Sequence, residues 1–153
     1  MTWLEHRIPP PVVGALLAAG MWGIASVGPQ FELPAGPRYV VVGALAVAGA
    51  AFDVLGLLAF FALRTTINPL RPDRSTALAT RGVYRVTRNP MYVGMALLLL
   101  AWAACLQAIL PLAGPALFVL YITRFQIRPE ERMLRAIFGE EYAAYTARVR
   151  RWL

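Results

Sequence analysis

Lysine is absent from the sequence, and cysteine and histidine occur once each, so its 15 positively charged residues are all arginine. A single cysteine excludes an internal disulfide bond, and we interpret Cys105, inside an apolar run, as a packing residue. The sole histidine, His6, lies near the N-terminus, which leaves no histidine–cysteine cluster for a metal and no catalytic triad built on histidine. We therefore expect no metal site. Any catalysis has to use arginine, carboxylates, tyrosine, asparagine or backbone groups.

The composition is typical of a membrane protein. Hydrophobic residues make up 59% of the 153 residues and the mean hydropathy is +0.57, whereas soluble proteins average about 45–50% apolar residues. The length fits one domain. The net charge of +7 is concentrated in two stretches, residues 64–90 with six arginines and residues 124–153 with seven. Such patches suit anionic lipid headgroups or an anionic ligand, and we expect no nucleic-acid partner.

The apolar residues fall into segments that we interpret as transmembrane helices, at residues 11–27, 38–63, 91–110 and 112–124. No residue from Met91 to Thr123 is charged, and Pro111, Gly114 and Pro115 interrupt this stretch, which predicts a helical hairpin. Apolar side chains recur at helical spacing on both sides of Gly139, as expected for two amphipathic helices. The prediction is an all-α integral membrane bundle of about four transmembrane helices: two spans in 1–63, a loop at 64–90, the hairpin at 91–124, and cytoplasmic helices at 125–153.

The arginines also predict the orientation in the membrane. Residues 64–90 and 124–153 are rich in arginine, whereas residues 28–37 contain none and residues 107–113 are uncharged. Because short loops rich in arginine stay in the cytoplasm, we expect both basic segments and both termini on the cytoplasmic side of a bacterial inner membrane. Any site formed by the polar motifs would face the cytoplasm.

The tripeptide Arg88-Asn89-Pro90 directly precedes the third apolar segment. Proline is favoured at the first helical position because its missing N–H would have no partner there. The following amides, of Met91 and Tyr92, are then expected to be free, and such a helix N-terminus attracts anions. The alternative is that Pro90 only begins the helix and Arg88 only marks the membrane boundary. Gly94 could serve helix packing or bring a ligand close to the backbone.

Carboxylates occur at three further places of interest. Arg128-Pro129-Glu130-Glu131 begins a helix, and its carboxylates could also hold a ribose diol or an ammonium group, whereas we assign Glu140 and Glu141 to helix capping. Asp53 lies inside the second span, where a carboxylate usually faces a partner or a water-filled cavity. It either has a functional partner, such as an arginine, or makes a polar contact between helices.

Three elements occur in a specific order: the run TTINPLRPDRSTALATRGVYRVTRNPMYVG, a charge-free hairpin, and the run RPEERMLRAIFGEEYAAYTARVRRWL. This order resembles the isoprenylcysteine carboxyl methyltransferase family and the related phospholipid methyltransferases, over roughly residues 60–153. In that family, a small membrane helix bundle binds S-adenosyl-L-methionine in a cytosol-facing pocket built from the C-terminal half.

The resemblance implies S-adenosyl-L-methionine as cofactor and S-adenosyl-L-homocysteine as product. It implies a pocket with one wall formed by Tyr84, Arg88, Asn89, Pro90, Tyr92 and Gly94, and another formed by Glu130 and Glu131. Eukaryotic members carry histidine where this chain carries Asn89, and an amide can hydrogen-bond a ligand but cannot act as a base near neutral pH. For the catalytic group we expect Glu131 together with Arg124 and Arg128, which would hold an anionic acceptor by bidentate contact.

The predicted function is an integral membrane methyltransferase that uses S-adenosylmethionine and acts on a lipophilic acceptor. Transfer from a sulfonium needs alignment more than acid–base groups, which agrees with the residues available. The first expectation for the acceptor is a carboxyl group of an isoprenylcysteine-like compound, and the alternative is a phospholipid amine. Its tail would enter from the membrane lipids between spans. A non-catalytic lipid-binding or transporter module is the alternative of another class, and no feature favours a reductase-like relative with a nicotinamide cofactor.

Overall fold

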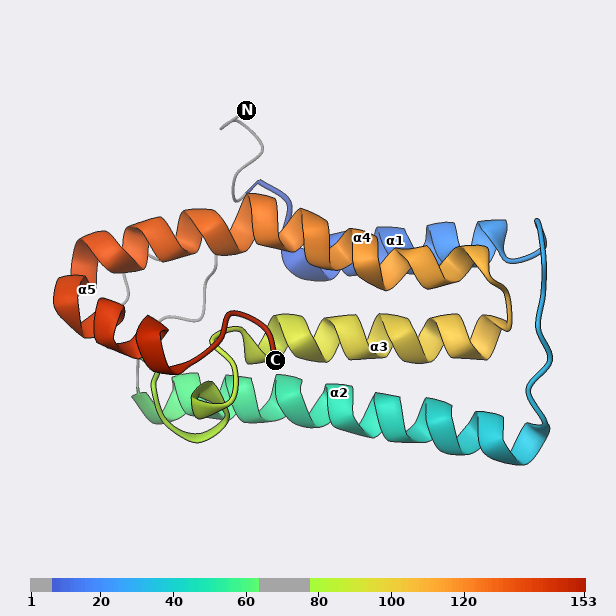
Figure 1. Cartoon of the computed structure of the whole chain (residues 1–153), viewed down its shortest axis with the longest axis horizontal. Coiled ribbons are helices and arrows are strands. Elements are labelled where there is room, and N and C mark those ends of the chain that lie inside the picture. Colours follow the sequence, from blue (N-terminus) through green and yellow to red (C-terminus); the bar gives the residue numbers. More distant parts are fainter. Residues whose placement is uncertain (1–6, 64–77) are drawn as a thin grey trace.

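The computed structural model describes residues 7–63 and 78–153, which form a bundle of helices (Figure 1). The long helices are α1 (Pro10–Ile24), α2 (Ala35–Leu63), α3 (Pro90–Leu106), α4 (Ala113–Ile122) and α5 (Arg128–Arg148). Three short helical turns complete the order, at Gly82–Arg85, Leu110–Leu112 and Thr123–Ile127. The predicted all-α membrane bundle is confirmed. The polar segment Thr65 to Pro69 lies outside the described residues.

The third helix, α3, is the centre of the bundle. It packs against α1, α2 and α4, and Figure 1 shows it between α2 and α4. Buried residues of α1, α3 and α4 form the core, among them Val13, Leu99 and Phe118. Large apolar side chains on α2, including Val40 and Val47, are exposed. Such an apolar outer surface suits lipid as the surrounding solvent.

Among the described residues, two segments are long and apolar enough to cross a membrane, Ala35–Ala59 and Leu110–Arg148. The other two apolar helices, α1 and α3, have 15 and 17 residues and are shorter. At about 1.5 Å per residue, they are roughly 22 and 25 Å long, a little less than the hydrocarbon core of a typical bilayer. Four membrane crossings with both ends in the cytoplasm therefore stay a prediction.

The predicted helical hairpin is present in α3 and α4. Gln107 ends α3 in the left-handed conformation, with φ of 52°, and the turn Leu110–Leu112 leads into α4. The loop between α1 and α2 is tied to this turn, because the Phe31 amide donates to the Gln107 carbonyl over 3.0 Å and the Ile109 amide to the Pro29 carbonyl over 3.1 Å. These bonds fix one end of the bundle, opposite the predicted site.

Glycines allow α2 and α3 to approach closely. A Cβ atom added to Gly94 would lie 2.7 Å from the Gly49 carbonyl oxygen and would also meet the Asp53 carboxyl group. A Cβ atom added to Gly56 would lie 2.8 Å from Met91 Cγ. Small residues at helix contacts of this kind bring backbones together in lipid. The structure therefore places Gly94 in the α2–α3 contact.

The junction between α4 and α5 differs from the expected boundary at residue 124. The helical backbone continues from α4 through a π-helical turn at Thr123–Ile127 into α5. Pro129 has no N–H to bond the carbonyl of residue 125, and the wider turn directly precedes this proline. The expected break at Gly139 is confirmed, since its φ of 47° and ψ of −118° kink α5.

Candidate functional site

The two predicted walls meet where α3 and α5 begin. Asn89 is the N-cap residue of α3 and Pro90 is its first residue, while Pro129 and Glu130 stand in the first turn of α5. Because α4 runs back along α3, the start of α5 returns to the start of α3 (Figure 1). The turn at Gly82–Arg85 contributes the buried side chain of Tyr84. Tyr92 and Glu130, 38 positions apart in the sequence, are thereby neighbours in space.

A short hydrogen bond connects the walls directly. The Tyr92 hydroxyl donates to Glu130 Oε1 over 2.7 Å, and Tyr92 is itself buried. Burial raises the pKa of Glu130 from 4.5 to about 8; the Tyr92 hydrogen bond opposes this rise and the negative charge of Glu131 adds to it. The Glu130 carboxyl is therefore mostly protonated at neutral pH. A cation placed beside it would favour the ionised form.

Glu131 lies between two arginines. Its Oε1 atom is 3.3 Å from Arg88 Nη2 and accepts a hydrogen bond from Arg151 Nε over 2.8 Å. Its Oε2 atom accepts a second bond from Arg151 Nη2 over 2.7 Å. The Glu131 side chain is only 14% exposed and the Arg88 side chain 13%. Both oxygens of Glu131 are thus engaged within the protein, and the ligand-binding role expected for this residue stays a prediction.

The start of α3 is not an open anion site of the kind that was expected. The Tyr92 amide donates to the Asn89 carbonyl over 3.1 Å, and the Val93 amide donates to the same oxygen over 3.0 Å. The expectation of a free Tyr92 amide is therefore wrong, because the carbonyl of the N-cap residue accepts its hydrogen. An anion at this place would depend on Arg88 instead. Arg88 Nε is buried and has no hydrogen-bond partner among the described residues.

Three tyrosines surround the same region. The Tyr145 hydroxyl donates to the Tyr84 carbonyl over 2.7 Å, which fixes α5 to the turn before α3. The rings of Tyr142 and Tyr145 lie 6.3 Å apart, centroid to centroid. Burial raises the pKa of Tyr84, Tyr142 and Tyr145, and the Arg88 charge opposes the rise at Tyr142 and Tyr145. These hydroxyls stay protonated near neutral pH and can donate hydrogen bonds.

Arg124, Arg128 and Gly94 complete the set of predicted residues. Arg124 and Arg128 are exposed at the α4–α5 junction, and Arg124 lies over the ring of Phe125 at 5.4 Å from its centroid. Gly94 faces Asp53 and Gly49 of α2. Asp53 Oδ1 is buried and accepts no hydrogen bond from the described residues. The arginine partner considered for Asp53 is therefore not found in the part of the chain that the structure describes.

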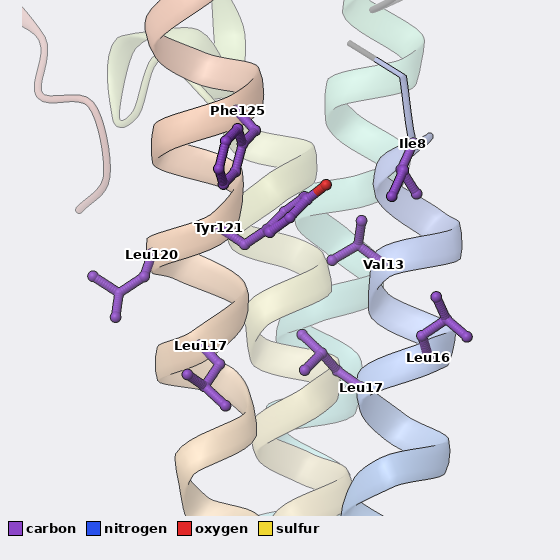
Figure 2. A pocket seen from close by; sticks show the side chains of 8 residues that line it. All are labelled: Ile8, Val13, Leu16, Leu17, Leu117, Leu120, Tyr121 and Phe125. Carbon is purple, nitrogen blue, oxygen red and sulfur yellow. The ribbon is translucent and has the colours of Figure 1, made fainter. Parts of the chain in front are cut away.

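An apolar groove runs between α1 and α4. It has a volume of about 570 Å³ and is lined by Ile8, Val13, Leu16, Leu17, Leu117, Leu120, Tyr121 and Phe125. In Figure 2, the Tyr121 ring extends from α4 towards α1, while Val13 and Leu17 extend from α1 towards α4. The groove ends at Phe125, beside exposed Arg124. A hydrocarbon chain fits such a lining, and the arginine would lie near its polar end.

Sequence reasoning missed Arg151 as a member of the site. It was counted only as part of a basic C-terminal stretch, although its side chain binds Glu131 and its carbonyl accepts hydrogen bonds from Thr87 and Asn89. No local pattern marks such contacts, because they join residues 20 to 64 positions apart.

Comparisons with known proteins agree with the motif order. Residues 37–141 match the family described as phospholipid methyltransferase. An uncharacterized protein of Haemophilus influenzae is 46% identical over 63 residues, which make up 41% of this chain and 100% of that protein. A probable protein-S-isoprenylcysteine O-methyltransferase of Oryza sativa is 43% identical over 77 residues, 47% of this chain and 38% of that protein.

Protein-S-isoprenylcysteine O-methyltransferase B of Arabidopsis thaliana is 33% identical over 90 residues, 56% of this chain and 43% of the plant protein. The chain thus spans less than half the length of the plant relatives it matches. No solved structure matches the chain.

Proposed function

Because the chain belongs to the phospholipid methyltransferase family, we propose that it transfers a methyl group from S-adenosylmethionine to a lipophilic acceptor. The observation that carries the proposal is the hydrogen bond of 2.7 Å between Tyr92 and Glu130. It joins the two sequence motifs on which a cofactor pocket was expected. The names of the family and of the plant relatives support methyl transfer as the reaction.

The polar groups present suit the amino-acid end of S-adenosylmethionine, which carries a carboxylate and an ammonium group. Arg88 Nε is a buried donor without a partner among the described residues, and leaving such a donor unpaired costs free energy. A ligand carboxylate would provide the missing acceptor. Glu130 would face the ammonium or sulfonium charge with its ionised carboxylate. When bound, the cofactor supplies an electrophilic methyl group on a positively charged sulfur.

The protein's own residues mainly bind and orient. Arg88 holds an anion at one side of the site, and Glu130 holds a cation at the other. Tyr92 fixes the orientation of Glu130 through its hydroxyl, while its buried ring helps to exclude water. Such alignment is the main requirement for a displacement in which charge is dispersed.

The groove between α1 and α4 supports a lipophilic acceptor. Its apolar lining, from Val13 to Phe125, would hold a hydrocarbon tail that enters from the bilayer. Arg124, which adjoins the groove residue Phe125, and Arg128 are exposed, and they could bind an anionic group of the acceptor by bidentate contact. We propose these two arginines as acceptor-binding residues.

The residues favour a carboxyl group of an isoprenylcysteine-like compound as the methyl acceptor. A carboxylate attacks without losing a proton, whereas a protonated amine first has to lose one. Asn89 stands where eukaryotic relatives carry histidine and cannot accept that proton. The names of the plant relatives support the same choice for the acceptor. A phospholipid amine is the second candidate, favoured by the name of the matching family.

The test is calorimetric titration of S-adenosylhomocysteine into the purified chain in detergent. We expect saturable binding, and a loss of at least about tenfold in affinity for Arg88→Gln, since a hydrogen bond to a charged group is removed. Arg85→Gln is the matched control, because Arg85 is exposed in the preceding turn. Absence of binding by the unmodified chain would refute the proposal in favour of a non-catalytic lipid-binding or transporter module.

A second experiment separates the acceptors. The chain is incubated with methyl-labelled S-adenosylmethionine and membrane lipids, and the lipids are extracted and treated with base. Release of the label as methanol identifies a carboxyl methyl ester. Label that is not released as methanol, and stays on the nitrogen of the headgroup after base treatment, identifies a methylated amine.

A further inference from the structure

The C-terminal segment, residues 149–153, closes back onto the start of α3. The Arg88 amide donates to the Arg150 carbonyl over 3.0 Å. Thr87 Oγ1 and Asn89 Nδ2 both donate to the Arg151 carbonyl, over 3.1 and 2.9 Å. Thr87 is completely buried by this contact region. The segment thereby covers the turn that presents Arg88 and Asn89.

The tip of this segment is held on its other side by the π-helical turn after α4 and by α5. Trp152 Nε1 donates to Thr123 Oγ1 over 3.1 Å. The Arg151 guanidinium bonds both oxygens of Glu131, over 2.8 and 2.7 Å. These bonds raise the pKa of Arg151 further above its usual value. The C-terminal segment therefore adds a link between the Arg88 turn and the Glu131 helix, beside the direct Arg88–Glu131 pair.

Glu131 has two competing guanidinium partners. Arg151 takes the bidentate geometry with its Nε and Nη2 atoms, whereas Arg88 approaches with Nη2 alone at 3.3 Å. The Arg88 side chain also makes a hydrogen bond with Tyr142, and its Nε atom is buried without a partner among the described residues. A carboxylate freed from Arg151 would be available for the same two-pronged contact with Arg88, because paired N–H groups match a carboxylate best. That rearrangement would occupy Arg88 Nε, the donor proposed for the ligand carboxylate.

We infer that Arg151 is a positioning residue, which holds Glu131 in place so that Arg88 Nε stays available for the carboxylate of the cofactor. This inference rests on the proposed function. It also distinguishes the paired glutamates: Glu131 orients Arg88 from within the protein, and Glu130 faces the ligand. Asn89 contributes by anchoring the Arg151 carbonyl with its side-chain amide.

Arg151→Gln provides the first test, with the full chain in detergent and S-adenosylhomocysteine as the probe. We expect its dissociation constant to rise about tenfold or more, as for loss of a charge-assisted contact. In turnover, KM for S-adenosylmethionine should rise by a similar factor while kcat changes little. Arg151→Lys should recover part of the affinity, because it restores the charge without the paired donors. Arg150→Gln is the control in the same segment, with its side chain exposed.

The double variant Arg151→Gln, Glu131→Gln separates positioning from a purely structural role. Removal of the Glu131 charge removes the competitor for Arg88, so this variant should bind S-adenosylhomocysteine more tightly than Arg151→Gln alone. A double variant that binds as weakly as Arg151→Gln, or more weakly, overturns the inference. An Arg151→Gln variant with unchanged affinity also overturns the inference. After either result, the proposed function still stands if the unmodified chain binds S-adenosylhomocysteine. Failure of the unmodified chain to bind removes the proposed function together with the inference.

Discussion

Replacement of Glu130 by glutamine removes a carboxyl group that changes charge near neutral pH. Burial raises the pKa of Glu130 to about 8, with the Tyr92 hydrogen bond acting against this rise. At pH 7 only about one tenth of unliganded molecules then carry the ionised group. Glutamine preserves the size of the side chain and its ability to accept from the Tyr92 hydroxyl, but it carries no charge at any pH.

The expected effect of Glu130→Gln on ligand affinity follows from this protonation equilibrium. A ligand with a positive group binds the ionised carboxylate, so the affinity contributed by Glu130 should rise about tenfold per pH unit up to pH 8 and level off above. At pH 7, binding should release most of one proton from the carboxyl group, since most of the sites are protonated beforehand. At pH 8, Glu130→Gln should bind about 10- to 100-fold more weakly than the unmodified chain.

The assay is calorimetric titration of S-adenosylhomocysteine at pH 6, 7 and 8, in two buffers of different ionisation enthalpy at each pH. The α-amino group of the ligand itself loses its charge at alkaline pH, so the informative quantity is the ratio of the two proteins' affinities. This ratio should grow with pH, and the proton release from Glu130 should vanish in the glutamine variant. A ratio that stays constant from pH 6 to 8 would refute the role assigned to Glu130.

Three further predictions test other parts of the structure. Because the pKa of Glu130 is raised in the folded state, the folded chain binds this proton more tightly than the unfolded chain. The unliganded chain should therefore lose melting temperature relative to the Glu130→Gln variant as the pH rises from 4.5 to about 8. Gly94→Ala would place a Cβ atom 2.7 Å from a carbonyl oxygen of α2 and should lower the free energy of unfolding by about 1–3 kcal/mol, measured by denaturant titration. Gly43→Ala, whose Cβ atom would meet no other atom within 4 Å, should not lower it. Leu117→Trp narrows the groove and should raise KM for a long-chain acceptor several-fold without changing the affinity for S-adenosylhomocysteine. The control, Leu112→Trp at the opposite end of the bundle, should leave both quantities unchanged. Equal effects of the two substitutions would contradict a tail site between α1 and α4.

Local chemistry explains why much of the fold was predictable from the sequence. Pro90 and Pro129 each stand at the start of a helix, where a missing N–H costs little, and they mark the starts of α3 and α5. The charge-free stretch with central prolines forms the hairpin, and Gly139 kinks α5 with a positive φ. Since the hairpin returns the chain, the meeting of Tyr92 with Glu130 also followed from the order of the motifs.

The rest depends on contacts between distant residues. Nothing near Arg151 indicates that its carbonyl would anchor Asn89 or that its guanidinium would bind Glu131. Likewise, the expected free amide of Tyr92 bonds the Asn89 carbonyl, because the backbone conformation at Asn89 places that oxygen within reach. The position of Gly94 against Asp53 depends on how α2 and α3 approach each other. Hydrophobic periodicity identifies helices but does not specify such pairings.

Transfer of a labelled methyl group is the most direct measurement of the proposed activity. The purified chain in detergent is incubated with methyl-labelled S-adenosylmethionine and a membrane lipid extract, with Glu130→Gln as the matched control. We predict label in the organic phase for the unmodified chain and a strong reduction for the variant. Equal labelling by the two proteins would contradict the site at Tyr92 and Glu130, and absence of labelled lipid, together with absence of S-adenosylhomocysteine binding, would contradict methyl transfer itself.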